Sequence, residues 1–212
     1  MQDLEDNRLF LLNRLGILRL LSIIEALVIG FLAFVFIKDL IIAVILACIV
    51  GILFFRFTSK KLILAKNELE LNITRLFLRQ NKAKLKLSSI NEKDFLKLNF
   101  LQNLSEFKSV NSFEFDDFKL YDLLFKDEFK RAFCGVLVCF NKELKQDANA
   151  DISDIFIRVK DRNFNTNVFF KKGNSVLIPS LKNPFFANLN LTVKTNLELM
   201  QENLKKIRNI NP

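Results

Sequence analysis

Glu25 is the residue of this chain whose position most needs a chemical explanation, because it lies inside a long apolar run. A carboxylate in hydrocarbon costs at least about 2.5 kcal/mol, so a cation or hydrogen-bond donor should accompany it. Ser22 lies one helical turn earlier on the same face, and Arg56 lies in the next apolar run. We therefore expect Glu25 to pair with Arg56, assisted by Ser22, or to contact a partner's membrane helix. Proton or ion handling and a carboxylate that snorkels toward water are the remaining alternatives.

Two apolar runs, residues 20–37 and 40–57, must position these side chains. Each run contains 18 residues, which is enough to cross a hydrocarbon core of about 30 Å at about 1.5 Å per residue. Only Lys38 and Asp39 separate the runs, so the sequence predicts an antiparallel transmembrane helical hairpin over residues 17–57. In such a hairpin, residues whose numbers sum to about 77 lie at one depth. Arg56 is then about one turn nearer the membrane boundary than the residue that faces Glu25.

The flanks of the hairpin predict its orientation. Residues 1–16 form an amphipathic segment; a cleaved signal sequence is a poor alternative because this segment begins acidic and a second apolar run follows at once. Basic residues gather before and after the hairpin, whereas the turn offers only Lys38, so both termini should be cytoplasmic. We expect a multi-pass protein of a bacterial inner membrane. The flanking basic residues are Arg8, Arg14, Arg19, Arg56, Lys60, Lys61 and Lys66.

Most other chemistry is excluded or disfavoured by composition. The chain has no histidine, so Ser-His, Cys-His and His-metal sites cannot exist, and its five glycines form no phosphate-binding loop. Of three cysteines, Cys134 and Cys139 lie five apart in one predicted strand and face opposite ways, so we expect free thiols. We expect no catalytic site, no metal and no cofactor. The densest carboxylates are interpreted as solvated loop charges: Asp116, Asp117, Asp122, Asp127, Glu128, Asp151, Asp154 and Asp161.

A basic helical stem, residues 58–90, should continue the second apolar run. Residues 1–57 are neutral, so the net charge of +9 belongs to the rest of the chain. Lys60, Lys61 and Lys66 could contact anionic phospholipid headgroups. The stem carries two apolar stripes, which indicate either burial on both sides or contact with a partner or a second copy of the chain. Nucleic acid is not expected, since no nucleic-acid-reading motif is present.

Residues 91–212 are expected to form a cytoplasmic α+β domain. Asn91 or Ser89 should cap a helix from Glu92 to about residue 104, and Thr195 with Glu198 should form a capping box for a closing helix. Alternation of apolar and polar residues predicts a mostly antiparallel sheet, with a hairpin turn at residues 171–174 and a central strand at residues 132–140. The other predicted strands include residues 113–115, 118–120, 155–159, 168–170, 176–178 and 189–193.

The segment Phe133-Cys134-Gly135-Val136, followed by Phe140-Asn141-Lys142, resembles a bacterial inner-membrane family of unknown function. That family has an N-terminal two-helix anchor, a basic helical stem and a strand with the pattern Phe-x-Gly. The resemblance covers about residues 10–145. It implies the architecture of the chain, but because the family has no known activity it implies nothing about function.

The sequence as a whole favours a non-enzymatic protein that acts through contacts. We expect a membrane-anchored accessory, scaffold or assembly factor whose partner is another integral-membrane protein; self-association is also compatible with the stripes on the stem. The first alternative is a membrane-organising protein that binds anionic lipid through its basic stem. The second is an enzyme with a carboxylate site.

Overall fold

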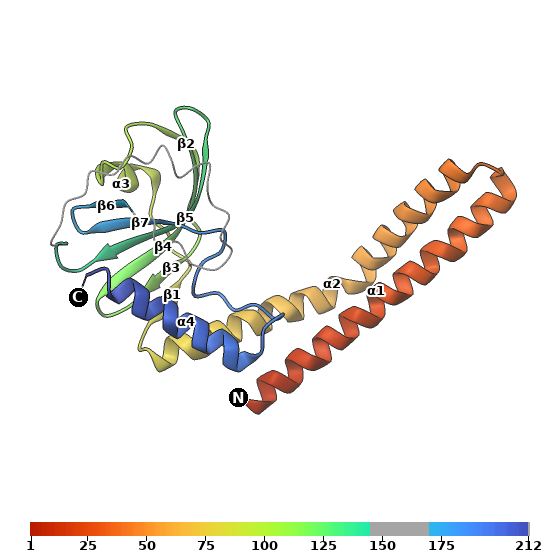
Figure 1. Ribbon diagram of the computed structural model, residues 1–212, viewed down its shortest axis with the longest axis horizontal. Coiled ribbons are helices and arrows are strands. Elements are labelled where there is room, and N and C mark those ends of the chain that lie inside the picture. The colour runs from red at the N-terminus through yellow and green to blue at the C-terminus, as the bar shows by residue number, and fades with distance from the viewer. Residues whose placement is uncertain (145–169, 212) are drawn as a thin grey trace. The chain divides into compact units, whose positions relative to one another are not determined.

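The computed structural model describes residues 1–144 and 170–211 (Figure 1). It has the predicted α+β class: two long apolar helices, then a seven-stranded antiparallel sheet and a C-terminal helix. The chain divides into two compact units, and each combines distant parts of the sequence. The first unit contains Met1–Ile73 and Asn188–Asn196, and the second contains Thr74–Ala187 and Leu197–Pro212.

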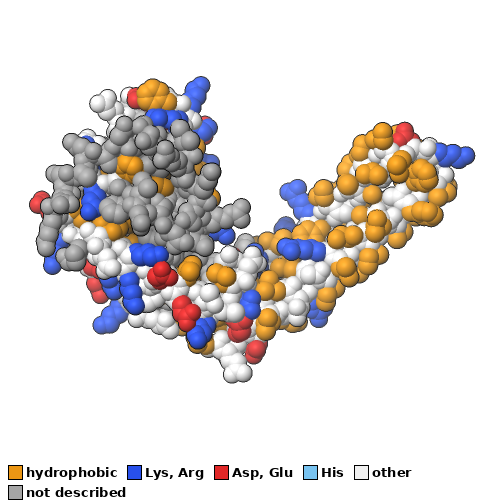
Figure 2. All heavy atoms as spheres, in the orientation of Figure 1, with side chains coloured by type: hydrophobic (Ala, Val, Ile, Leu, Met, Phe, Trp, Pro, Cys, Tyr) orange, Lys and Arg blue, Asp and Glu red, His pale blue; other side chains and the backbone are white. Residues whose placement is uncertain are grey.

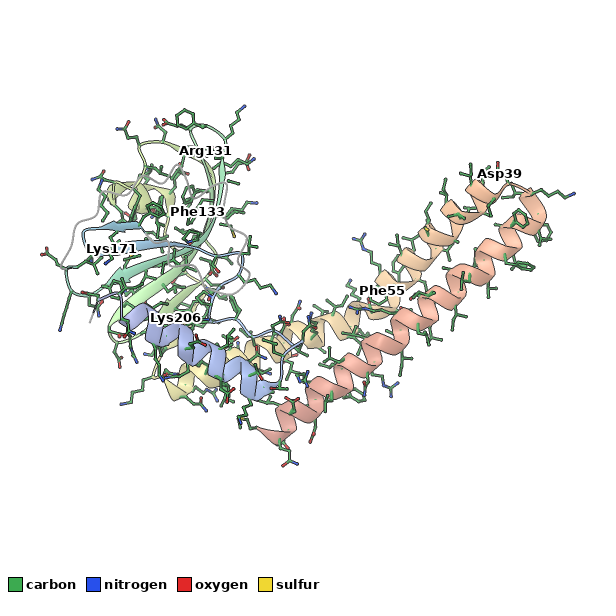
Figure 3. The ribbon with its side chains drawn as sticks, in the orientation of Figure 1. Asp39, Phe55, Arg131, Phe133, Lys171 and Lys206 are labelled. Carbon is green, nitrogen blue, oxygen red and sulfur yellow. The ribbon has the colours of Figure 1, made fainter. Side chains whose placement is uncertain are left out.

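The first unit is built on a helical hairpin, as the sequence predicts. Helix α1 spans Gln2–Ile37 and α2 spans Leu40–Gln80. Lys38 adopts a left-handed conformation (φ 57°) and donates its backbone N–H to the carbonyl of Phe34, which ends α1. The Asp39 carboxylate then accepts the backbone N–H groups of Ile41 and Ile42 at 2.9 and 3.2 Å, which starts α2. Two residues thus complete the turn (Figure 3).

Small residues allow the two helices to approach closely. A Cβ added to Gly30 would lie 2.9 Å from the Cβ of Ala47, and a Cβ added to Gly51 would lie 2.9 Å from that of Ala26. Both pairs of residue numbers sum to 77, so the predicted depth relation holds. The packing follows the small-residue pattern of membrane helix pairs, in which backbones meet because no large side chain separates them.

The outward faces of the hairpin are apolar. Only 6% of the most apolar stretch of each helix is buried within the protein, and both helices are long and apolar enough to span a membrane. In Figure 2, hydrophobic side chains cover the visible face of the hairpin. A helix of a water-soluble protein would bury such a surface in its core.

The second unit is an antiparallel sheet with the strand order β1-β3-β4-β5-β7-β6, and β2 also pairs with β4. The strands are β1 (Lys84–Lys86), β2 (Leu104–Lys108), β3 (Ser112–Glu114), β4 (Phe118–Asp127), β5 (Ala132–Phe140), β6 (Phe170–Lys172) and β7 (Ser175–Pro179). The predicted central strand is confirmed as β5, in which Val136, Leu137 and Val138 are all at most 1% exposed. Both faces of the sheet are therefore covered.

Phenylalanines fill the core on both sides of the sheet. Phe95, from helix α3 (Glu92–Lys97), is fully buried in one cluster and packs on Phe125 with ring centroids 5.3 Å apart. Elsewhere in the unit, Phe185 stacks on Phe77 of α2 at 5.5 Å and contacts Phe113 at 5.9 Å. Buried residues of helix α4 (Val193–Arg208) complete the core: Met200, Leu204 and Ile207.

Two local predictions are wrong at their ends. Asn91 does cap α3, accepting the backbone N–H of Asp94 at 2.7 Å, but the helix ends at Lys97 instead of residue 104. Leu98, Leu101 and Leu104, which suggested a longer helix, pack against the same phenylalanine cluster from a turn and a strand. The stem helix likewise ends at Gln80, and β1 follows it.

The predicted strand at residues 189–193 is absent. Residues 189–192 form a loop that leads into α4. Helix α4 begins at Val193, earlier than the expected capping box, and the Thr192 hydroxyl accepts the backbone N–H of Thr195 at 3.1 Å. The predicted turn at residues 171–174 is confirmed, with Gly173 at φ 57°. The predicted strand at residues 155–159, most of that at 168–170, and Asp151, Asp154 and Asp161 lie outside the described residues.

Candidate functional site

A groove of about 560 Å³ lies between α1 and α2 in the first unit. Its floor consists of small side chains and its sides of larger apolar ones. Arg19 and Arg56 contribute its two charged side chains, and no acidic residue lines it. The other lining residues are Ser22, Ile23, Ala26, Ala47, Cys48, Gly51, Ile52, Phe55, Ser59 and Ile63.

Hydroxyl groups that bond to their own helix accompany a bend in α2 beside this groove. The Ser59 hydroxyl donates to the carbonyl of Phe55 at 2.5 Å, and the Thr58 hydroxyl donates to the carbonyl of Phe54 at 2.7 Å. Such bonds compete with the helical ladder and bend helices. Figure 3 labels Phe55 where α2 changes direction.

The hydroxyl of Ser22 is also committed to its own helix. It donates to the carbonyl of Leu18 at 2.7 Å, and Ser22 is only 5% exposed. Ser22 lines the groove together with Arg56, so the structure brings these two predicted residues to one surface. In the described part of the chain, the Ser22 hydroxyl makes no hydrogen bond to Glu25.

Glu25 is half-buried on α1. Among the described residues, no ion pair within 4.0 Å and no hydrogen bond joins its side chain to Arg56 or to any other group. Its depth follows from the register, in which Ala26 faces Gly51. A pair between Glu25 and Arg56 therefore stays a prediction, and the carboxylate remains available to a group from another molecule.

The lysines of the stem lie on the part of α2 that follows the apolar run. Lys60 and Lys61 are exposed, whereas Lys66 is half-buried and lies 3.8 Å from a carboxylate oxygen of Glu70. Lys66 is thus partly neutralised by its own helix. Of these three lysines, Lys60 and Lys61 have the exposure that contact with anionic headgroups requires.

A second cluster of charges holds the loop 188–193 within the first unit. Glu5 and Arg8 form an ion pair on α1, and Arg8, only 7% exposed, also donates to the carbonyl of Leu189 at 3.1 Å. Glu5 accepts the backbone N–H of Val193 at 2.8 Å, at the start of α4. Glu70 of α2 accepts the backbone N–H of Leu189 at 3.0 Å. We call Glu5, Arg8 and Glu70 with these backbone groups the loop clamp.

The carboxylates of the sheet have structural explanations. Asp127 is 3% exposed and accepts hydrogen bonds within the β4–β5 turn, so the interpretation of this residue as a solvated charge is wrong. Asp122 accepts hydrogen bonds from the amides of Asn111 and Asn183; burial raises the pKa of its carboxyl group, and these two bonds partly oppose that effect. The two carboxylates lie five residues apart on β4 and point to opposite faces. In the described parts of the chain, no group of three possible metal ligands occurs.

Sequence reasoning missed the groove and the loop clamp for different reasons. Small residues recur every four positions on both helices, at Ser22, Ala26 and Gly30 and at Ala43, Ala47 and Gly51, and this pattern could have revealed the helix contact. Arg19 was considered only as one of the basic residues that flank the hairpin, and not as part of a binding site. The loop clamp left no local pattern, because its residues are far apart in the sequence.

Comparisons of the chain with models of protein families, with curated proteins and with solved structures find no match. The resemblance noted at residues 133–142 therefore contributes no function. What the chain does must be inferred from its own residues and geometry.

Proposed function

We propose that this protein is a membrane-anchored, non-enzymatic accessory or scaffold subunit that binds another integral-membrane protein through its helical hairpin. The observation that carries the proposal is Glu25: a half-buried carboxylate in an apolar run, with no ion pair or hydrogen bond recorded among the described residues. A carboxylate at this depth is costly unless a group of opposite charge or a hydrogen-bond donor meets it. A lysine, arginine or amide side chain on a partner's membrane helix supplies that group.

The surface around Glu25 supports a helix as the partner. Neighbouring side chains on α1, Val28 and Leu32, are 53% and 45% exposed and are apolar. A membrane helix packs against such a face through van der Waals contact, and one polar contact fixes its rotation and depth. The α+β unit is then tethered beside the partner, where its sheet and helices can make further contacts.

The orientation and location are part of the same proposal. Basic residues on both flanks of the hairpin favour cytoplasmic termini in a bacterial inner membrane. A reporter fused after Pro212 that is active only in the cytoplasm would support this orientation. A fusion active only in the periplasm would overturn it.

The test of the partner contact is photo-crosslinking in native membranes. A photo-reactive amino acid at Val28 lies one turn from Glu25 on the same face and should capture the partner. When Glu25 is present, we expect a crosslinked product that contains an integral-membrane protein. In the Glu25→Gln variant this product should be lost, although the abundance of the variant itself should be unchanged. Glu68→Gln is the matched control, because Glu68 is an exposed carboxylate on α2 beyond the apolar run.

Other outcomes of the same experiment reject the proposal. Glu25→Gln could lower the abundance of the protein, and the charge swap Glu25→Arg with Arg56→Glu could restore it. That result would assign Glu25 to an internal pair with Arg56. A product that contains only this chain would indicate self-association. A Glu25→Gln variant with normal abundance and an unchanged crosslinked product would leave Glu25 without a partner role.

A further inference from the structure

We propose that the groove between α1 and α2 binds one anionic phospholipid of the surrounding bilayer. The headgroup phosphate lies between Arg19 and Arg56, and an acyl chain follows the floor formed by Ala26, Ala47 and Gly51. This site is separate from the proposed partner contact, because Glu25 is not among the residues that line the groove.

The charge of the groove selects an anion. Arg19 and Arg56 are both exposed, and within the described residues neither makes an ion pair, a hydrogen bond or a ring contact. Their guanidinium groups are therefore free to donate to a ligand, and the planar array of N–H groups of arginine suits phosphate oxygens. By contrast, Arg8 is paired with Glu5, and Arg14 stacks on the ring of Phe10 at 5.2 Å.

The depth of the two arginines matches that of a headgroup. Arg19 directly precedes the first apolar run, and Arg56 lies in the last turn of the second. Their numbers sum to 75, close to the value of 77 that the contacts of Gly30 and Gly51 establish for equal depth. Both guanidinium groups consequently reach the same membrane boundary.

The floor of the groove continues from that boundary into the hydrocarbon. Ala26 is seven residues from Arg19, which corresponds to about 10 Å along α1. The floor residues Ala26, Ala47 and Gly51 have no side chain beyond Cβ, so they leave a channel beside the helix contact. Its volume of about 560 Å³ falls in the range of small-molecule sites. A polar, cationic rim above an apolar channel complements a phospholipid, with its charged head and apolar tail.

The test measures which lipids the full-length chain retains. The protein is placed in nanodiscs that contain equal amounts of phosphatidylcholine and phosphatidylglycerol, and native mass spectrometry then counts the lipids that remain bound. We expect one retained phosphatidylglycerol on the wild-type chain. Because one basic residue near an anionic surface contributes about a fivefold change in affinity, the double variant Arg19→Gln, Arg56→Gln should retain about 30-fold less.

Three further variants separate the groove from general basic attraction. Arg14→Gln removes the same charge from α1 outside the groove and should keep the lipid. Lys60→Gln with Lys61→Gln removes two exposed charges from the stem and should also keep it. Cys48→Phe fills the groove without changing its charge and should lower retention by preventing the acyl chain from entering.

The outcomes that overturn the site are equally specific. Unchanged retention in the double arginine variant would refute a role for the groove. Equal losses in Arg14→Gln or in the stem variant would show unspecific attraction to the bilayer surface. Retention of phosphatidylcholine and phosphatidylglycerol in equal amounts would refute recognition of an anionic headgroup. Glu25→Gln should leave lipid retention unchanged, which distinguishes this site from the proposed partner contact.

Discussion

Replacement of Asp127 should destabilise the β4–β5 hairpin by an amount that the structure allows us to estimate. Its carboxylate accepts the backbone N–H groups of Phe129 and Arg131 at 3.0 and 2.7 Å, and the Nε–H of Arg131 at 2.7 Å. Asp127→Ala removes the two carboxylate oxygens that accept these three hydrogen bonds, which should cost about 3 kcal/mol. Asp127→Asn keeps an oxygen for the backbone but loses the charge, so it should cost about 1 kcal/mol.

The cost should depend on pH. Burial opposes ionisation of Asp127, but hydrogen bonds from Arg131 and Phe129 and the charge of Arg131 outweigh it, so the pKa of the carboxyl group is lowered in the folded protein. A lowered pKa contributes stability above the unfolded value of about 4, and this contribution is lost as the pH falls through the folded value. The difference between wild type and Asp127→Asn should therefore shrink below about pH 4.

Hydrogen exchange of the peptide that covers β4 and β5 measures this cost. Mass spectrometry of the full-length chain in increasing urea gives the free energy of opening for wild type, Asp127→Ala and Asp127→Asn. Asp94→Asn is the control, since Asp94 is an exposed carboxylate on α3, and it should change little. Equal costs for the alanine and asparagine variants, or a difference that persists unchanged at low pH, would refute the proposed roles of the three hydrogen bonds.

Two further predictions concern the loop clamp and the central strand. Arg8→Ala removes the donor to the Leu189 carbonyl and the cation beside Glu5. Hydrogen exchange at residues 189 and 193 should therefore accelerate at least tenfold, as expected for a loss of about 2 kcal/mol. Arg14→Ala is the control, and unchanged exchange rates in Arg8→Ala would contradict the clamp. A Cβ at Gly135 would lie 2.3 Å from the carbonyl oxygen of Ile178, so Gly135→Ala should destabilise the sheet by about 3 kcal/mol in urea unfolding. Gly16→Ala is its control, because a Cβ there meets nothing within 4 Å, and equal stability of the two variants would contradict this reasoning.

The parts of the fold that the sequence predicts are those with strong local periodicity. The two apolar runs define the hairpin, and only Lys38 and Asp39 separate them. This short turn sets the register of the two helices, in which Gly30 lies opposite Ala47. The unbroken apolar run of residues 132–140 identifies the central strand because both of its faces are buried.

Where prediction failed, packing against distant residues decided the structure. Leu98 and Leu101 have helical spacing, yet they reach the phenylalanine cluster from outside a helix. The loop at residues 189–193 alternates like a strand, but carboxylates of Glu5 and Glu70 bind its N–H groups in place of a neighbouring strand.

The Phe-x-Gly spacing in β5 also has a packing explanation. Phe133 and Gly135 lie on the same face of the strand, two residues apart. The ring of Phe133 would lie 2.7 Å from a Cβ added at Gly135, so the ring occupies the space that any other residue would need. The pattern therefore requires no ligand or catalytic role.

The loop clamp sets an order of events during synthesis. Arg8 and Leu189 are 181 residues apart, and Glu5 and Val193 are 188 apart. At a synthesis rate of about 5–20 residues per second, roughly 10–40 seconds pass between the emergence of the two sides of the clamp. During this interval the two apolar helices and the described strands are synthesised before the backbone groups of Leu189 and Val193 that Arg8 and Glu5 bind. A chain released before Leu189 would carry both helices of the hairpin without the clamp, so the clamp can close only after synthesis has passed Val193.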